Sequence, residues 1–150
     1  MLSYLYVFPA HLIGIAITLI ALLIATVTDI KHNTIPIGLF PITLVLLAII
    51  ERPTLENLLG MLIMGILFFM FAAFGNSGGG DVLMMMAIGY QLGIGPVLWC
   101  GLISYSIYAI FSVCYYWTRK KKDKNKHKQF PFAPFALIGY LTVEIMFFIF

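Results

Sequence analysis

Long apolar runs separated by short polar turns dominate the hydrophobic pattern of this chain. A helix that crosses a membrane needs about 20 predominantly apolar residues, and the pattern predicts six such helices. The stretch from Val82 to Thr118 carries no charge and is too long for one span, so the turn residues Gly93 to Pro96 are expected to divide it and leave a short fourth helix. The expected helices are about Leu5–Thr28, Ile35–Ile50, Leu58–Phe74, Val82–Leu92, Val97–Trp117, and a last one that enters through residues 130–135 and runs to the C-terminus.

Composition places the chain in a membrane. Of its 150 residues, 62% are hydrophobic and only 10% are charged, whereas about a quarter of the residues of a soluble domain are charged. A soluble helical protein is therefore not expected. The fold class predicted is a single all-α domain over residues 1–150, an integral membrane bundle of six helices. The first charged side chain is Asp29, so the basic start of a cleaved secretory signal is missing, and the first helix is interpreted as a true span.

The positions of the basic residues predict the orientation of the bundle. Lys31 and seven basic residues between Arg119 and Lys128 follow the first and fifth helices, whereas the loops on the opposite side contain only Arg52. Because cytoplasmic loops carry the excess of Lys and Arg, both termini are expected outside. The basic run 119–128 is expected to contact anionic lipid headgroups rather than nucleic acid. Gly89 and Gly93 form a GxxxG pair, a weak signal of close helix packing.

Six carboxylates remain to be explained, because acids beside a membrane span are costly. Glu51, Glu56 and Asp123 are expected to be solvated loop charges. Glu144 lies inside the last helix, where it could reach the outer surface or pair with a polar group such as Tyr140.

Asp29 and Asp81 differ from the other acids. Asp29 ends the first helix and Asp81 begins the fourth, so the predicted topology brings both to the cytoplasmic face. Two carboxylates that share a site hold one proton between them, which is the machinery of aspartic proteolysis. The helix dipole favours an anion at Asp81 and a neutral acid at Asp29, so we expect Asp81 to act as base and Asp29 as acid. The simpler interpretations are a helix cap for Asp81 and a depth marker for Asp29.

Three glycines precede Asp81. Gly78, Gly79 and Gly80 allow close approach of an extended substrate backbone, and we expect a flexible wall there. A phosphate-binding loop is not expected, because the Gly-Lys-Ser/Thr ending and the preceding strand are missing. No cofactor and no metal are expected.

These motifs resemble the type IV prepilin peptidase family of GxGD-type intramembrane aspartic proteases. The resemblance rests on Gly78-Gly-Gly-Asp81, on Ile35-Pro36 shortly after Asp29, on Gly89 eight residues after Asp81, and on Pro131-Phe-Ala-Pro134. It covers nearly the whole chain in the right order. The chain is most similar to the minimal form found in tight-adherence (Flp) pilus systems.

The resemblance implies a function. Such enzymes remove the short basic leader from prepilins or pseudopilins at the cytoplasmic face of a bacterial or archaeal inner membrane, and Asp29 and Asp81 would be the catalytic pair. Because the chain has no CxxC insertion, N-methyltransferase activity is not expected. Leu83 and Ile37 depart from the family, which often has Lys and Asn there. The residues expected to form the substrate-binding or loop positions are Gly78, Gly79, Gly80, Ile35, Pro36, Pro131 and Pro134.

Other interpretations stay open. A degenerate homologue could act in pilus or secretion assembly without proteolysis. A small transporter would need acids near the bilayer midplane, whereas Asp29 and Asp81 lie at helix ends. A presenilin-like protease is disfavoured, because Thr28 precedes Asp29 where that class has Tyr and the sequence Pro134-Phe-Ala-Leu137 interrupts its Pro-Ala-Leu motif.

Overall fold

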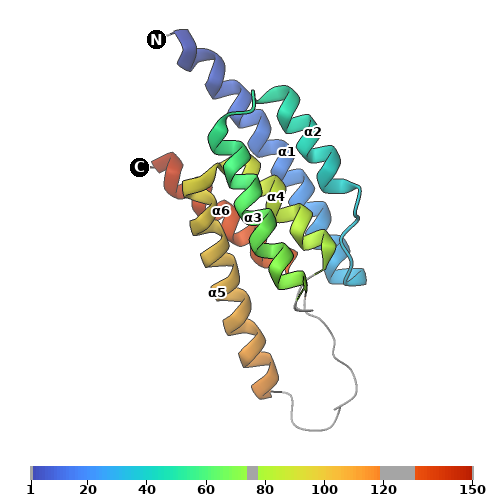
Figure 1. Ribbon diagram of the computed structural model, residues 1–150. Coiled ribbons are helices and arrows are strands. Elements are labelled where there is room, and N and C mark those ends of the chain that lie inside the picture. Colours follow the sequence, from blue (N-terminus) through green and yellow to red (C-terminus); the bar gives the residue numbers. More distant parts are fainter. Residues whose placement is uncertain (1, 74–77, 119–130, 150) are drawn as a thin grey trace.

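The computed structural model describes residues 2–73, 78–118 and 131–149, and these residues form helices joined by short turns (Figure 1). The described part is therefore all-helical, as predicted. The helices are α1 (Leu2–His32), α2 (Leu39–Ile50), α3 (Leu55–Ala73), α4 (Gly79–Leu92), α5 (Ile94–Thr118) and α6 (Ala133–Ile149).

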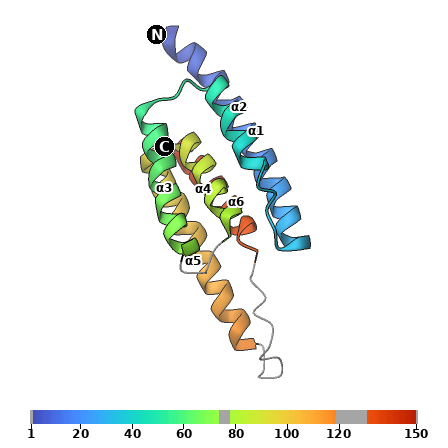
Figure 2. The same ribbon diagram turned by 45° about the vertical axis from the view of Figure 1, so that its right-hand side comes forward.

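The short helix α4 is the centre of the bundle. It packs against each of the five other helices, whereas α1 packs beside α2 and α6, and α5 beside α6 and α3. No Cα atom of α2 lies within 8 Å of α3, so the ring of helices around α4 is not continuous on that side. Figure 2 shows α4 between α2 and α3 from this direction.

Three helices are long and apolar enough to cross a membrane, counted over the described residues: Ala10–His32 of α1, α3 itself, and Ile94–Tyr115 of α5. The chain is therefore a multi-pass membrane protein. The segments Leu39–Ile50 and Ala133–Phe147 are apolar but shorter. The 14 residues of α4 span about 21 Å, which is less than the thickness of the hydrocarbon core. The surrounding helices bury most of its residues from Met84 to Gln91.

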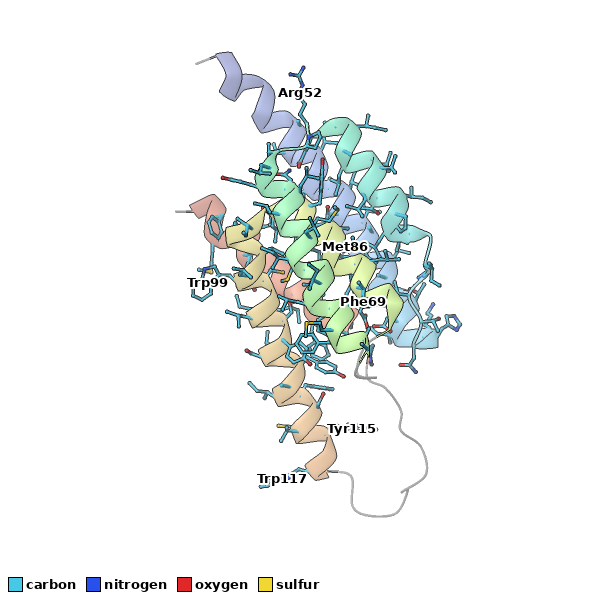
Figure 3. The ribbon with its side chains drawn as sticks, viewed as in Figure 1. Arg52, Phe69, Met86, Trp99, Tyr115 and Trp117 are labelled. Carbon is cyan, nitrogen blue, oxygen red and sulfur yellow. The ribbon has the colours of Figure 1, made fainter. Side chains whose placement is uncertain are left out.

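Tryptophans mark both ends of α5. Trp99 and Trp117 are 57% and 90% exposed, and Figure 3 shows them far apart along this helix. Their spacing corresponds to about 27 Å of helix, close to the hydrocarbon thickness of about 30 Å. Because tryptophan prefers the two membrane–water interfaces, α5 has the pattern of a complete span.

Successive helices alternate in direction. The last turns of α1, α3 and α5 lie toward one end of the bundle, and the first turn of α1 and the last turn of α6 lie toward the other (Figure 1). Arg52 lies at the end that holds the termini (Figure 3), and Lys31 belongs to the last turn of α1 at the opposite end. Lys31 and Arg52 therefore lie at opposite ends of the bundle, as predicted, and the termini lie on the side of Arg52. The basic run 119–128, with Asp123, lies outside the described residues.

Glycines allow α3 and α4 to pack with their backbones in close approach. A Cβ atom built on Gly89 would lie 2.5 Å from the Gly60 carbonyl oxygen, and one built on Gly60 would lie 2.8 Å from the Gly93 carbonyl carbon. The close packing predicted from Gly89 and Gly93 is therefore confirmed. Gly93 also ends α4 with a φ of 74°, a conformation that suits glycine.

Several predicted helix boundaries are wrong: α3, α4 and α5 each begin three residues before the predicted start, at Leu55, Gly79 and Ile94, so Gly93 alone separates α4 from α5. α1 continues past Asp29 to His32, because Asn33 adopts φ 50° and its N–H bonds the Asp29 carbonyl at 2.8 Å, which is a left-handed cap. α2 begins at Leu39, so Pro36 lies in the turn before this helix rather than in its first turn.

The packing of Gly89 on Gly60 predicts a steric effect. Gly89→Ala should destabilise the bundle by about 1–3 kcal/mol, because both clashing atoms of Gly60 are backbone and cannot rotate away. Thermal unfolding in detergent measures the change. Gly95→Ala is the matched control, since a Cβ there meets nothing within 4 Å, and equal midpoints for the two variants would contradict the account.

Candidate active site

Asp29 is a buried carboxylate held by a distant part of the chain. It lies in the last turns of α1 and is only 6% exposed. Its Oδ2 atom accepts a hydrogen bond from the backbone N–H of Ala133 at 3.0 Å, which joins residues 104 positions apart. The end of α1 is thereby tied to the beginning of α6.

The start of α6 explains why this N–H is available. The N–H groups of Phe135 and Ala136 donate to the Phe132 carbonyl oxygen at 3.0 and 3.2 Å, and Pro134 has no N–H to donate. Ala133 is the first residue of α6, and such residues have no partner within their own helix. Its N–H therefore points to Asp29, at a helix end that favours negative charge.

Asp81 is the third residue of α4. Its Oδ2 atom accepts a hydrogen bond from the Gly78 N–H at 3.0 Å, the contact expected of an acid that caps its own helix. The side-chain contact of Asp81 thus caps the helix from its third position, whereas the predicted place of Asp81 as the N-cap is taken by Gly78. It leaves room for chemistry, because the side chain is only partly buried and a carboxylate has more than one lone pair.

The two carboxylates therefore have similar dipole environments. Asp29 belongs to the C-terminal part of α1, but its carboxylate meets the N-terminus of α6, and Asp81 lies at the N-terminus of α4. Both helix ends favour the anion. Asp29 nevertheless lies in the last turn of α1 and Asp81 in the first turn of α4, as predicted, so the assignment of Asp29 as the acid and Asp81 as the base stays a prediction.

A close contact links the segments that follow and precede the two acids. A Cβ atom built on Gly80 would lie 2.7 Å from the Ile35 Cβ atom, so the Ile35-Pro36 turn packs directly on the residue before Asp81. Figures 1 and 2 show the end of α1, the start of α4 and the start of α6 at the same end of the bundle. Asp29 and Asp81 thus share this end.

The glycines are not the loop that the sequence suggested. Gly78 caps α4 with an extended backbone (φ −87°, ψ 158°), and Gly79 and Gly80 form the first turn of that helix. Gly78 and Gly79 are exposed and a Cβ on Gly79 meets nothing within 4 Å. Only Gly80 is required by close approach. Residues 74–77, which would complete the predicted flexible wall, lie outside the described residues.

The remaining predicted positions surround this end. Pro36 is exposed, and Ile35 packs partly buried against the core. Pro131 and Pro134 flank Phe132 and Ala133 and are partly buried. The residues that sequence reasoning missed are Phe132 and Ala133 themselves. The only available signal was their place within the Pro-Phe-Ala-Pro pattern, because the identity of a side chain does not indicate which backbone N–H will act as a donor.

The two family departures sit in different settings. Ile37 is 73% exposed in the turn before α2, whereas Leu83 is partly buried against the core one turn after Gly79.

Other acids gather at the opposite end of α4. The Glu51 side chain is only 11% exposed and its Oε1 atom lies 3.4 Å from Nδ1 of His11, so the prediction of a solvated Glu51 is wrong. Gln91 Nε2 donates to Glu144 Oε1 at 3.4 Å, and the Tyr140 hydroxyl donates to Gln91 Oε1. Glu144 therefore has a polar partner inside the bundle. Among the described residues, no group of three or more His, Cys, Asp or Glu side chains could hold a metal ion.

Comparison with known proteins identifies one related family. A sequence model of the Type IV leader peptidase family matches residues 16–113, more than half of the chain, and the match includes both Asp29 and Asp81. No curated protein and no solved structure matches the chain.

The contact between Gly80 and Ile35 predicts different tolerances for adjacent glycines. Gly80→Ala should lower the thermal midpoint, at a cost of about 1–3 kcal/mol, because its Cβ would collide with Ile35. Gly79→Pro should be tolerated, because Gly79 is the first residue of α4 and proline suits that position. Gly78 already has the extended backbone that precedes a proline. Thermal unfolding in detergent compares the two, and a larger loss in Gly79→Pro would refute this ordering.

Proposed function

Because the chain belongs to the type IV leader peptidase family, we propose that it is a membrane aspartic endopeptidase that removes the short basic leader from prepilins or pseudopilins. The observation that carries this proposal is the placement of Asp29 and Asp81 at one end of the bundle, on segments joined through Gly80 and Ile35. Asp29 is held by Ala133 and Asp81 by Gly78, so both carboxylates have defined orientations.

The chemistry needs one proton shared between the two acids. The ionised carboxylate takes a proton from a water molecule, whose oxygen attacks the carbonyl carbon of the scissile peptide bond. The protonated partner donates a hydrogen bond to the carbonyl oxygen. The carboxyl group that took the proton from water then gives it to the amide nitrogen. The C–N bond breaks and the tetrahedral intermediate collapses to the two products. Because helix N-termini favour the anion at both positions, either aspartate can start the cycle as the base.

The cytoplasmic side is proposed for the end that contains both aspartates. Lys31 lies in the last turn of α1 at that end, the basic run 119–128 follows α5 in the sequence, and positive residues are retained in the cytoplasm. Three helices of the chain meet the requirements of membrane spans, and we infer that all six cross or line the bacterial or archaeal inner membrane. The substrate's basic leader would reach this face while its hydrophobic helix stays in the lipid.

A side of α4 supports approach of that hydrophobic helix. Gly79, Leu83 and Met86 follow one another along one face of α4, and none of them is buried. Met86 packs at the edge of this face, on Gly65 of α3, and Figure 3 labels it on α4. Because α2 and α3 do not approach one another, we infer that the substrate helix reaches Asp81 from this direction.

A second candidate is a homologue that acts in pilus or secretion assembly without proteolysis. The observation that favours it is the apolar character of Leu83 and Ile37 beside the site, where related enzymes often have polar groups. A transporter is less well supported, because the partly buried acids Glu51 and Glu144 are engaged with His11 and Gln91.

Loss of either aspartate tests the proposed function. When the chain is produced together with prepilins from the same genome, Asp29→Asn and Asp81→Asn should each lower leader removal by at least about 100-fold, because an amide cannot take or give the proton. Mass spectrometry of the substrate measures the loss of the leader and names the bond that is cut.

The control for this assay is Glu56→Gln, which makes the same chemical change in an exposed acid at the other end of the bundle. It should cleave normally at equal membrane levels. Cleavage that survives Asp29→Asn or Asp81→Asn would reject the proposed pair. A wild-type chain that cuts none of the prepilins would favour the non-proteolytic homologue.

The approach along α4 makes a separate prediction. Leu83→Trp should raise KM by about tenfold with kcat unchanged, because a bulkier side chain would crowd the substrate helix without touching the reacting atoms. Steady-state cleavage of a purified prepilin in detergent measures both constants. Leu102→Trp is the control, on a 61% exposed position of α5, and an equal rise in KM there would dismiss the proposed route.

A further inference from the structure

We propose that Phe132 is a positioning residue for Asp29, and that the rings that pair with it directly, Phe68 of α3 and Tyr105 and Tyr108 of α5, set the orientation of this carboxylate through it. This inference rests on the proposed function only for its effect on catalysis. The contacts on which it stands lie at the beginning of α6.

Phe132 is anchored by rings from two other helices. It is 7% exposed, and its ring centroid lies 5.5 Å from Phe68 of α3, 5.5 Å from Tyr108 and 6.4 Å from Tyr105 of α5. Ring pairs at such separations attract each other beyond the area they bury. The residue therefore has a fixed position between α3 and α5 although it precedes α6.

The backbone of Phe132 in turn fixes the donor to Asp29. The Phe132 carbonyl oxygen accepts the N–H groups of Phe135 and Ala136 and so starts the helix. The next N–H along the chain, that of Ala133, donates to Asp29 Oδ2. Ala133 is fully buried, so a shift of the Phe132 ring would move a donor that has no solvent to replace it.

The contact matters because the Asp29 carboxylate must keep a fixed orientation for catalysis although its own helix, α1, ends close to it. α1 ends three residues later, at His32, where Asn33 caps it, and the following turn is irregular. Backbone hydrogen bonds from Phe132 and Ala133 thus connect the carboxylate to the packed core. Small displacements of a catalytic group can lower a rate by about 100-fold.

Removal of the ring tests the inference in the cleavage assay. Phe132→Ala should lower kcat by at least about 10-fold and leave KM within about twofold, because the reacting group is displaced while the substrate's helix binds elsewhere. Phe132→Tyr, which keeps the ring and its pairs, should restore most of the rate.

Phe71→Ala is the matched control for general loosening. The Phe71 ring centroid lies 5.8 Å from that of Phe68 and 5.0 Å from that of Tyr105, so Phe71 belongs to the same cluster. Its substitution removes a ring of the same size as Phe132→Ala does. It should keep more than about half of the wild-type kcat, because Phe71 acts on Asp29 only through other rings. Equal losses of kcat in Phe71→Ala and Phe132→Ala, or a Phe132→Ala effect confined to KM, would overturn the proposal.

A second measurement needs no activity. Hydrogen exchange of the Ala133 amide, followed by NMR in detergent with ¹⁵N-alanine labelling, reports directly on its bond to Asp29. Protection should fall in Phe132→Ala and in Asp29→Ala, which removes the acceptor oxygen, and stay high in Phe71→Ala. Unchanged protection in Phe132→Ala refutes the positioning role. If the wild-type chain cuts no prepilin, the proposed function fails, and this exchange experiment still decides whether Phe132 holds the donor on Asp29.

Discussion

The structure depends on a short helix, α4, whose glycines let its backbone pack closely against its neighbours. Lipid provides no hydrophobic force between helices, so association inside a membrane needs close packing. Gly89 meets Gly60 of α3 in this way, and Gly80 meets Ile35 in the turn before α2. These two contacts hold opposite ends of α4 and leave Asp81 in its first turn, at the end shared with Asp29. A larger side chain at either position would move the central helix and with it one of the two acids.

The two proposed catalytic acids are held in different ways. The Asp81 carboxylate accepts a hydrogen bond from a nearby residue in the sequence, the N–H of Gly78. Asp29 depends on the start of α6, and that start depends on rings from α3 and α5. Four helices therefore contribute to the orientation of one buried carboxylate. The matched family segment, residues 16–113, contains both aspartates but ends before this support, so α6 adds to the site something that the family match does not describe.

The acids at the two ends of α4 have separate roles. Glu51 and Glu144 lie with His11, Gln91 and Tyr140 around the far end of the helix, and these contacts join α1, the end of α2, α4 and α6. A buried acid with polar partners contributes to the specificity of packing only if it is satisfied. We interpret this cluster as structural, and it leaves Asp29 and Asp81 as the pair at the end proposed to face the cytoplasm.

The sequence by itself determined the helical class, the membrane setting and the common end of Asp29 and Asp81, because apolar run length, charge distribution and helix direction are local or additive properties of the chain. The GxxxG pair also predicted close packing correctly. Tertiary structure decided the rest. The cap at Asn33, the helical state of Gly79 and Gly80, and the burial of Glu51 depend on what packs against each segment. The donor to Asp29 is a backbone group 104 residues away, and since every residue except proline carries the same N–H, only the fold selects which one it is.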